Sequence, residues 1–256
     1  MKIGVTGCAG RMGKMLCQAV IEAGLELSGG TERPESPVIG QELGKGKVFA
    51  DIKELFAVSD AVLDFTAPAA SVANAKAAAE TGKVLVIGTT GLTEAQRAEV
   101  AKAAEKAPIV LAPNMSVGVN LLQALVEKVA SILDPAYDIE IVEMHHRNKV
   151  DAPSGTALAL GKAAAKGRGE SLDKVACYER HGVIGARPVG EIGFATLRGG
   201  DVVGDHTVIF AGTGERIELT HKASSRAVFA NGAVRAALWA AGQKAGLYSM
   251  RDVLGF

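Results

Sequence analysis

The architecture follows from residues 2–13, which read KIGVTGCAGRMG. An apolar run over residues 2–5 predicts a short strand, and apolar residues then recur at helical spacing between Met12 and Ala23. Gly7, Gly10 and Gly13 connect the two elements. A strand, a glycine-rich turn and a helix in this order are typical of a unit that binds a nucleotide.

The same alternation of strands and helices continues to residue 116. Further strands are predicted at 25–31, 61–65, 84–88 and 109–112, with alanine-rich helices at 69–80 and 93–106, which indicates a parallel sheet with helices on both faces. Beyond it we expect helices at 119–133, 154–166 and 227–245, and β runs at 137–145, 191–197, 207–211 and 216–221. These later runs predict a mixed sheet, and the polar segments 33–47 and 167–187 are expected to be the least regular.

The glycine spacing departs from the more common G-x-G-x-x-G, because Ala9 occupies the place of the middle glycine. The physical roles are still available: Gly7 permits a tight turn, Gly10 lets the backbone approach a pyrophosphate, and Gly13 lets the helix pack closely. The helix N-terminus then offers N–H groups to the phosphates. A glycine-rich turn without any ligand is the alternative interpretation.

An acid at the end of the second predicted strand favours the nucleotide. Glu32 lies 19 positions after Gly13, close to the spacing of the acid that binds the adenosine ribose. Arg33 follows and suits the 2′-phosphate of NADP, so NADH and NADPH both remain open. Two later strand ends, Gly88-Thr89-Thr90-Gly91 and Ala112-Pro113-Asn114-Met115, are either ordinary turns or parts of the same site, since ligands lie beyond the carboxyl ends of parallel strands.

Composition excludes several classes of protein. The 256 residues are 48% hydrophobic and carry 28 basic and 28 acidic side chains, so the basic excess of a nucleic-acid binder is absent. Three cysteines are too few for a disulfide framework or a cysteine-rich zinc site, and they favour a reducing compartment. The uncharged stretch 107–126 contains proline and asparagine and therefore predicts a strand, a turn and a buried helix rather than a membrane span. We expect a soluble, cytoplasmic protein.

The most distinctive segment, residues 143–157, reads EMHHRNKVDAPSGTA. His145 and His146 point to opposite sides of an extended chain and make a poor zinc pair, so no metal is expected. A histidine suits proton transfer, and Lys149 suits either proton donation or anion binding. Ser154 opens a helix whose N–H groups suit a carboxylate. The alternative is a polar loop with an ordinary serine N-cap and histidines packed at a strand end.

These motifs, taken together, resemble the dihydrodipicolinate reductase family, the 4-hydroxy-tetrahydrodipicolinate reductases of lysine and diaminopimelate biosynthesis. The most specific match is His145-His-Arg-Asn-Lys-Val-Asp-Ala-Pro-Ser-Gly-Thr156. The likeness extends nearly end to end, through Val5–Gly13, Asp64–Thr66, Gly88–Gly91, Asn114–Asn120, Gly193–Thr196, His221–Arg226 and Phe229–Arg235.

The resemblance implies an α/β fold with a Rossmann-type nucleotide-binding domain built from residues 1–116 and 227–256. An α+β mixed-sheet domain, residues 117–226, would be inserted for substrate binding and tetramerisation. The implied reaction is the reduction of a cyclic imine dicarboxylate to tetrahydrodipicolinate by NADH or NADPH. No nucleic-acid or membrane partner is implied.

The resemblance also implies roles for individual residues. His145 and Lys149 would handle the proton, and either of them could deliver it. His146, Lys149, Gly155 and Thr156 would hold the substrate carboxylates. The cofactor would be held by Gly7, Cys8, Ala9, Gly10, Arg11, Met12, Glu32, Arg33, Gly88, Thr89, Thr90, Ala112, Pro113, Asn114 and Met115.

Two rival functions remain open from the residues alone. One is another nicotinamide-dependent oxidoreductase, which would not need the histidine–lysine segment. The other is a non-catalytic nucleotide sensor, which would keep the glycines and Glu32 alone. The β runs at 191–221 are apolar on both faces, and this predicts a homo-oligomer, which the resemblance makes a homotetramer.

Overall fold

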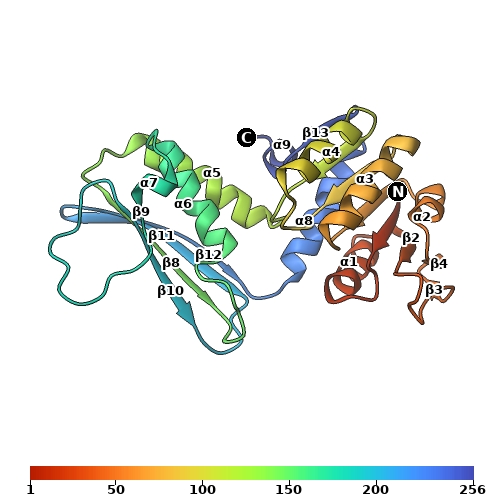
Figure 1. The fold of residues 1–256 in the computed structure, drawn as a ribbon, viewed down its shortest axis with the longest axis horizontal. Coiled ribbons are helices and arrows are strands. Elements are labelled where there is room, and N and C mark those ends of the chain that lie inside the picture. The colour runs from red at the N-terminus through yellow and green to blue at the C-terminus, as the bar shows by residue number, and fades with distance from the viewer. The chain divides into compact units, whose positions relative to one another are not determined.

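The computed structural model describes residues 1–256 as two compact units, Met1–Val117 with Ala227–Phe256, and Gly118–Arg226 (Figure 1). The strands of the first unit are β1 (Lys2–Thr6), β2 (Glu26–Thr31), β3 (Glu42–Leu43), β4 (Gly46–Phe49), β5 (Ala61–Asp64), β6 (Val84–Ile87), β7 (Pro108–Leu111) and β13 (Gly246–Tyr248). Its helices are α1 (Arg11–Glu22), α2 (Ile52–Val58), α3 (Pro68–Thr81), α4 (Glu94–Ala104), α8 (Ala227–Ala240) and α9 (Met250–Leu254).

These strands form one sheet in the order β13-β7-β6-β5-β1-β2-β4-β3. All neighbours are parallel except β3, which pairs antiparallel with β4. Successive side chains of a strand face opposite sides of a sheet, so Val62 packs in a cluster with α2, α3 and α4, while Leu63 packs in another with α1, α8 and α9. The expected parallel sheet with helices on both faces is confirmed.

The second unit contains α5 (Val117–Ile132), α6 (Gly155–Gly167) and α7 (Leu172–Val175), and the strands β8 (Asp138–His145), β9 (Ala176–Cys177), β10 (Ile192–Arg198), β11 (Gly204–Gly212) and β12 (Glu215–Ala223). Its sheet has the order β12-β11-β8-β10-β9 and is mixed, because β8 pairs parallel with β10 and antiparallel with β11. Helices α5 and α6 pack their apolar side chains on one face of it. The expected mixed sheet is therefore confirmed.

One boundary of the expected elements was wrong, and the two polar segments, although largely irregular, contain short elements that were not expected. The last helix ends at Ala240 rather than near residue 245, and the chain then adds β13 beside β7, where the rings of Trp239 and Tyr248 pack edge to face at 5.1 Å. The segment 33–47 contains β3 and the start of β4, and α2 follows with Asp51 capping its N-terminus. The segment 167–187 contains α7 and β9. No helix in the structure is both long and apolar enough to cross a membrane.

Candidate active site

The glycine turn between β1 and α1 is built for close backbone contact. Gly7 has a φ of +60°, a left-handed conformation that side chains disfavour, and its carbonyl accepts a hydrogen bond from the Gly10 amide at 3.0 Å. A Cβ at Gly13 would lie 2.0 Å from the Gly7 carbonyl oxygen. Gly13 is therefore needed because α1 packs against the turn itself. Gly10 caps α1 without any side-chain hydrogen bond, which leaves a helix N-terminus suited to phosphate.

Glu32 reaches this turn from the end of β2. Its Oε1 accepts a hydrogen bond from the Ala9 amide at 2.9 Å, so the acid and the glycine turn meet. A cavity of about 600 Å³ lies beside them and is also lined by Thr6, Thr66 and Arg33. Arg33 is exposed and lies 3.8 Å from a carboxylate oxygen of Glu35. An adenosine ribose in this cavity would meet the carboxylate of Glu32, with the exposed guanidinium of Arg33 next to it.

The other predicted strand ends lie on the opposite side of β1. Thr66 follows β5, and its amide donates a hydrogen bond to Oγ1 of Thr89, which follows β6, at 2.9 Å. The residues after β7 turn sharply, since Oδ1 of Asn114 accepts from the Ser116 amide at 2.8 Å. Met115 is buried in the core, so its side chain serves packing. The proposed cofactor segments follow five strands that are neighbours in the sheet, in the order β7, β6, β5, β1 and β2. They therefore gather along the carboxyl ends of the strands of one sheet.

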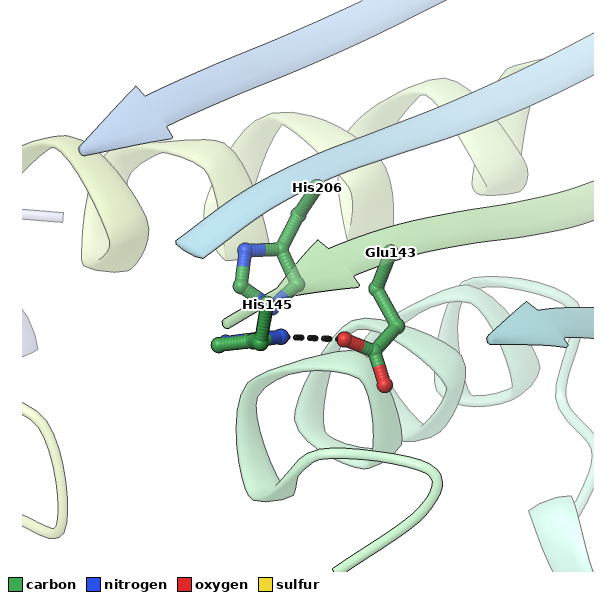
Figure 2. A group of neighbouring side chains, drawn as sticks. All are labelled: Glu143, His145 and His206. Atoms are coloured by element: carbon green, nitrogen blue, oxygen red, sulfur yellow. Dashed lines mark hydrogen bonds and ion pairs between the residues drawn. The ribbon is translucent and has the colours of Figure 1, made fainter. Parts of the chain in front are cut away.

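The second unit carries the histidine segment. Along β8, the residues Ile139, Ile141, Glu143 and His145 alternate onto the buried face, so the core face becomes polar at the carboxyl end of the strand. Glu143 is 1% exposed, and its Oε2 lies in hydrogen-bond contact with Nδ1 of His145 (Figure 2). A buried carboxylate thus orients the imidazole.

Neighbouring strands complete this cluster. Oε1 of Glu143 accepts from the Ser154 amide and from Nη2 of Arg198, both at 3.0 Å. His206 lies opposite Glu143 on β11, its ring centroid is 5.0 Å from that of His145, and its Nε2 lies 3.1 Å from Oγ of Ser154. Ser154 also caps α6, because its Oγ accepts from the Ala157 amide at 3.1 Å. The cluster therefore ties β8, β10 and β11 to the N-terminus of α6.

The loop between β8 and α6 holds the other predicted residues. Lys149 is mostly buried and pairs with Asp151, Nζ to Oδ1, at 2.8 Å. The space beside Gly155 is open, since an added Cβ would meet nothing within 4 Å. His146 lies just beyond β8, and its amide donates to the Val202 carbonyl at 2.7 Å. A cation and an accessible helix N-terminus thus lie on one loop, an arrangement that suits a carboxylate.

Burial and charge set the protonation of the cluster. Burial would raise the pKa of Glu143, but hydrogen bonds from Arg198, Ser154 and His145 outweigh it and hold that pKa below its usual value. Burial lowers the pKa of His145 and Glu143 raises it, with burial prevailing. Burial, followed by the neighbouring His145, lowers the pKa of His206 to about 4. At neutral pH, Glu143 is charged and His206 is neutral.

The same three side chains have the composition of a metal site. One ligating atom from each of Glu143, His145 and His206 lies within 4.8 Å of the others. Both carboxylate oxygens, however, already accept hydrogen bonds, and one of the donors is the Arg198 guanidinium, which repels a cation. The group is organised as a hydrogen-bonded network around His145.

Sequence reasoning missed Glu143, Arg198 and His206. The alternation of Ile139, Ile141 and His145 places Glu143 on the buried face, so a buried acid two residues from a histidine was a usable signal. No local pattern marked the other two, because they reach the site through strand pairing.

Family models match this chain along nearly its whole length. The family model for "Dihydrodipicolinate reductase, N-terminus" matches residues 1–115, and that for "Dihydrodipicolinate reductase, C-terminus" matches residues 118–254. A 4-hydroxy-tetrahydrodipicolinate reductase of Rhodopseudomonas palustris (strain BisB18) is 54% identical over the whole chain and 97% of its own length. The protein of the same name from Thiobacillus denitrificans is 53% identical over the whole chain and 98% of its own length.

Solved structures share the fold. A dipicolinate-bound dihydrodipicolinate reductase from Paenisporosarcina sp. TG-14 superposes with a TM-score of 0.81 over 97% of each chain, at 23% identity. An amine dehydrogenase from Mycobacterium smegmatis superposes with a TM-score of 0.60 at 12% identity, over 96% of this chain and 94% of its own.

Proposed function

This chain belongs to the dihydrodipicolinate reductase family, and we propose that it reduces 4-hydroxy-tetrahydrodipicolinate to tetrahydrodipicolinate in lysine and diaminopimelate biosynthesis. The protein is an oxidoreductase that uses a nicotinamide cofactor. The observation that carries the proposal is the identity of more than half of the residues to reductases of this name over the whole chain. A nucleotide sensor would not keep a buried acid beside a histidine.

The cofactor is assigned to the first unit. A reduced nicotinamide cofactor bound there would supply a hydride, that is, one proton together with two electrons. The glycine turn offers amide groups to the pyrophosphate, and Glu32 accepts hydrogen bonds from the adenosine ribose. The close approach of α1 at Gly13 and the φ of Gly7 fit this group, because neither position accepts a side chain without strain. Cys8–Met12, Gly88–Thr90 and Ala112–Met115 complete the proposed site.

The choice between NADH and NADPH depends on two adjacent residues. The Glu32 carboxylate favours a free 2′-hydroxyl, and Arg33 favours a 2′-phosphate. Arg33 is exposed and makes only a long contact with Glu35, so it is available to a phosphate. We propose that both cofactors are used.

The dicarboxylate is assigned to the second unit. Lys149 supplies a positive charge, Gly155 and Thr156 supply the start of α6, and His146 lies beside them on the same loop. Hydride addition to a conjugated imine leaves an electron-rich enamine, which must take up one proton. His145 or Lys149 delivers that proton, and solvent returns one to the donor.

The second unit is also assigned the contacts of a homotetramer. The sheet face opposite the helices carries Val142, Met144 and Leu197, of which Leu197 is 48% exposed. An exposed apolar sheet face of this kind is normally covered by another chain. The three free cysteines support a reducing, cytoplasmic location.

A coupled assay tests the proposed reaction. The upstream synthase converts pyruvate and aspartate semialdehyde into the substrate, and the absorbance of NADH or NADPH is followed after this protein is added. We expect consumption of the cofactor that requires both enzymes. Omission of the synthase is the control, and a complete mixture that consumes no more cofactor than this control would refute the function.

A further inference from the structure

Glu143 is the acid that the sequence left without a role. We propose that Glu143 is a positioning residue, whose carboxylate holds Nδ1–H of His145 and thereby makes Nε2 the nitrogen that exchanges a proton with the substrate. This inference rests on the proposed function, in which His145 handles the proton. Glu143 acts through the imidazole and contacts neither hydride donor nor substrate in this role.

The strand geometry explains why these two side chains meet. Glu143 and His145 are two residues apart on β8, so they project from the same face, and Figure 2 shows the carboxylate directed at the edge of the imidazole ring. The face belongs to the core, and the two residues are 1% and 8% exposed. Little water reaches the contact, so the hydrogen bond is stronger than it would be at a surface.

The carboxylate is held on both of its oxygens. Oε1 accepts from the Ser154 amide and from Arg198, and Oε2 faces His145. Nη2 of Arg198 also donates to the Asp151 carbonyl at 2.6 Å, which fixes the guanidinium to the loop before α6. These contacts fix the orientation of the Glu143 carboxylate, and its Oε2 can act toward His145 only as a hydrogen-bond acceptor.

An acceptor at Nδ1 determines the state of the ring. An ionised carboxylate cannot donate, so Nδ1 of His145 must carry the hydrogen. In the neutral ring Nε2 is then unprotonated, and in the charged ring the second proton is on Nε2. Gly204 lies beside this nitrogen, and because it has no side chain it leaves Nε2 uncovered on that side: a Cβ there would lie 3.0 Å from Nε2. The exchangeable proton is thus directed away from Glu143.

The charges around the ring make Glu143 necessary for protonation. His145 is faced by Glu143 from its own strand, by Arg198 from β10, by His206 from β11 and by Lys149 from the loop. Arg198 and Lys149 oppose a positive charge on the imidazole, and burial opposes it further. Glu143 is the group among these that favours the imidazolium.

Glu143→Gln separates this role from packing. The glutamine keeps the size of the side chain, and its oxygen still accepts from Ser154 and Arg198. Its amide nitrogen then faces His145 and donates, so Nδ1 must become an acceptor and the hydrogen moves to Nε2. The variant reverses the tautomer and removes the charge that favours the imidazolium, as an asparagine does in a serine-protease triad.

The first measurement uses the full-length protein labelled with ¹⁵N-histidine, without substrate. The chain has five histidines, so the spectrum is simple, and the signals of His145 are identified by their loss in His145→Asn. We expect the wild-type ring to carry hydrogen on Nδ1 above its pKa. In Glu143→Gln we expect hydrogen on Nε2 and a pKa lowered by about 1–3 units. Glu105→Gln, an exposed change at the end of α4, is the matched control and leaves His145 unchanged.

The second measurement follows kcat/KM against pH in the coupled assay. Activity that needs a protonated His145 falls as the pH rises through its pKa. We expect Glu143→Gln to move this fall to lower pH and to reduce kcat about 10²-fold or more at neutral pH, with little change in KM. A residue that serves only stability would change neither the position of the fall nor the tautomer.

The outcomes separate the two ideas. A wild-type His145 with hydrogen on Nε2 overturns the inference, and this holds even if Glu143→Gln does not fold. A variant that folds and keeps the wild-type tautomer and pH profile also overturns it. By contrast, the proposed function is refuted if the wild-type protein does not consume cofactor in the coupled assay, whichever tautomer His145 has.

Discussion

Replacement of Gly13 by alanine tests whether the packing of α1 against the glycine turn creates the cofactor site. In an ordinary helix position, glycine to alanine stabilises by about 1 kcal/mol. At Gly13, however, the new Cβ would lie 2.0 Å from the Gly7 carbonyl oxygen and 2.7 Å from Cα of Cys8. Both are backbone atoms, which cannot rotate away as the end of a side chain can. The turn or the helix must therefore shift by an ångström or more.

We expect this shift to reverse the sign of the substitution. Overpacking of this kind costs about 1–3 kcal/mol, which outweighs the gain in helix propensity. For a chain of this size, 1 kcal/mol corresponds to about 2–4 °C in Tm, so thermal unfolding should show a fall of several degrees. Affinity for NADH, measured by calorimetry, should fall at least about tenfold, because the amides of the turn move away from the pyrophosphate.

Gly242→Ala is the matched control in the same unit. A Cβ there would meet its nearest neighbour, the Trp239 carbonyl oxygen, at 3.7 Å, which is ordinary contact, and Gly242 has no left-handed φ. Its Tm and its affinity for NADH should stay close to those of the wild type. If Gly13→Ala behaved like Gly242→Ala, the close approach would not be what shapes the turn.

Four further outcomes are expected. In steady-state kinetics the wild type should use NADH and NADPH with kcat/KM values within about tenfold of each other. Arg33→Ala should lower kcat/KM for NADPH more than for NADH, and equal losses for the two cofactors would refute the role of Arg33. His145→Ala should lower kcat by about 10²–10⁴-fold, whereas Lys149→Ala should also raise KM; near-native kcat in both variants would leave the segment as a binding loop. Burial lowers the pKa of His206 to about 4 in the folded protein, so this histidine takes up a proton at a higher pH in the unfolded state. The free energy of unfolding should therefore fall by about 3 kcal/mol as the pH drops from about 6.5 to 4. Denaturation at several pH values should show a smaller fall in the free energy of unfolding for His206→Gln than for the wild type. An unchanged fall would show that the titration of His206 is not its cause. Light scattering at micromolar concentration should give the mass of a tetramer, and a monomer mass would contradict the proposed assembly.

Much of the candidate site could be predicted from the sequence because its parts are local. The glycines, Glu32 and the turns after β6 and β7 all follow predicted strands directly, and parallel strands place their carboxyl ends at one edge. The loop from His145 to Thr156 is continuous in the chain, and its composition alone indicated proton transfer and anion binding. Short elements were harder to predict, since β13 has only three residues and takes its place by pairing with β7, while Tyr248 packs against the ring of Trp239.

The sequence by itself determined the βα order, the glycine turn, the parallel sheet and the location of the histidine–lysine loop, because each depends on periodicity or on neighbours within one element. Only the tertiary structure decided what surrounds His145. Ser154 and His206 are 52 residues apart in the chain, and the antiparallel pairing of β11 with β8 brings His206 opposite Glu143. Arg198 arrives by the parallel pairing of β10 on the other side. Hydrogen bonds and burial between distant segments have no local signature, so the state of the imidazole became visible only in the folded chain.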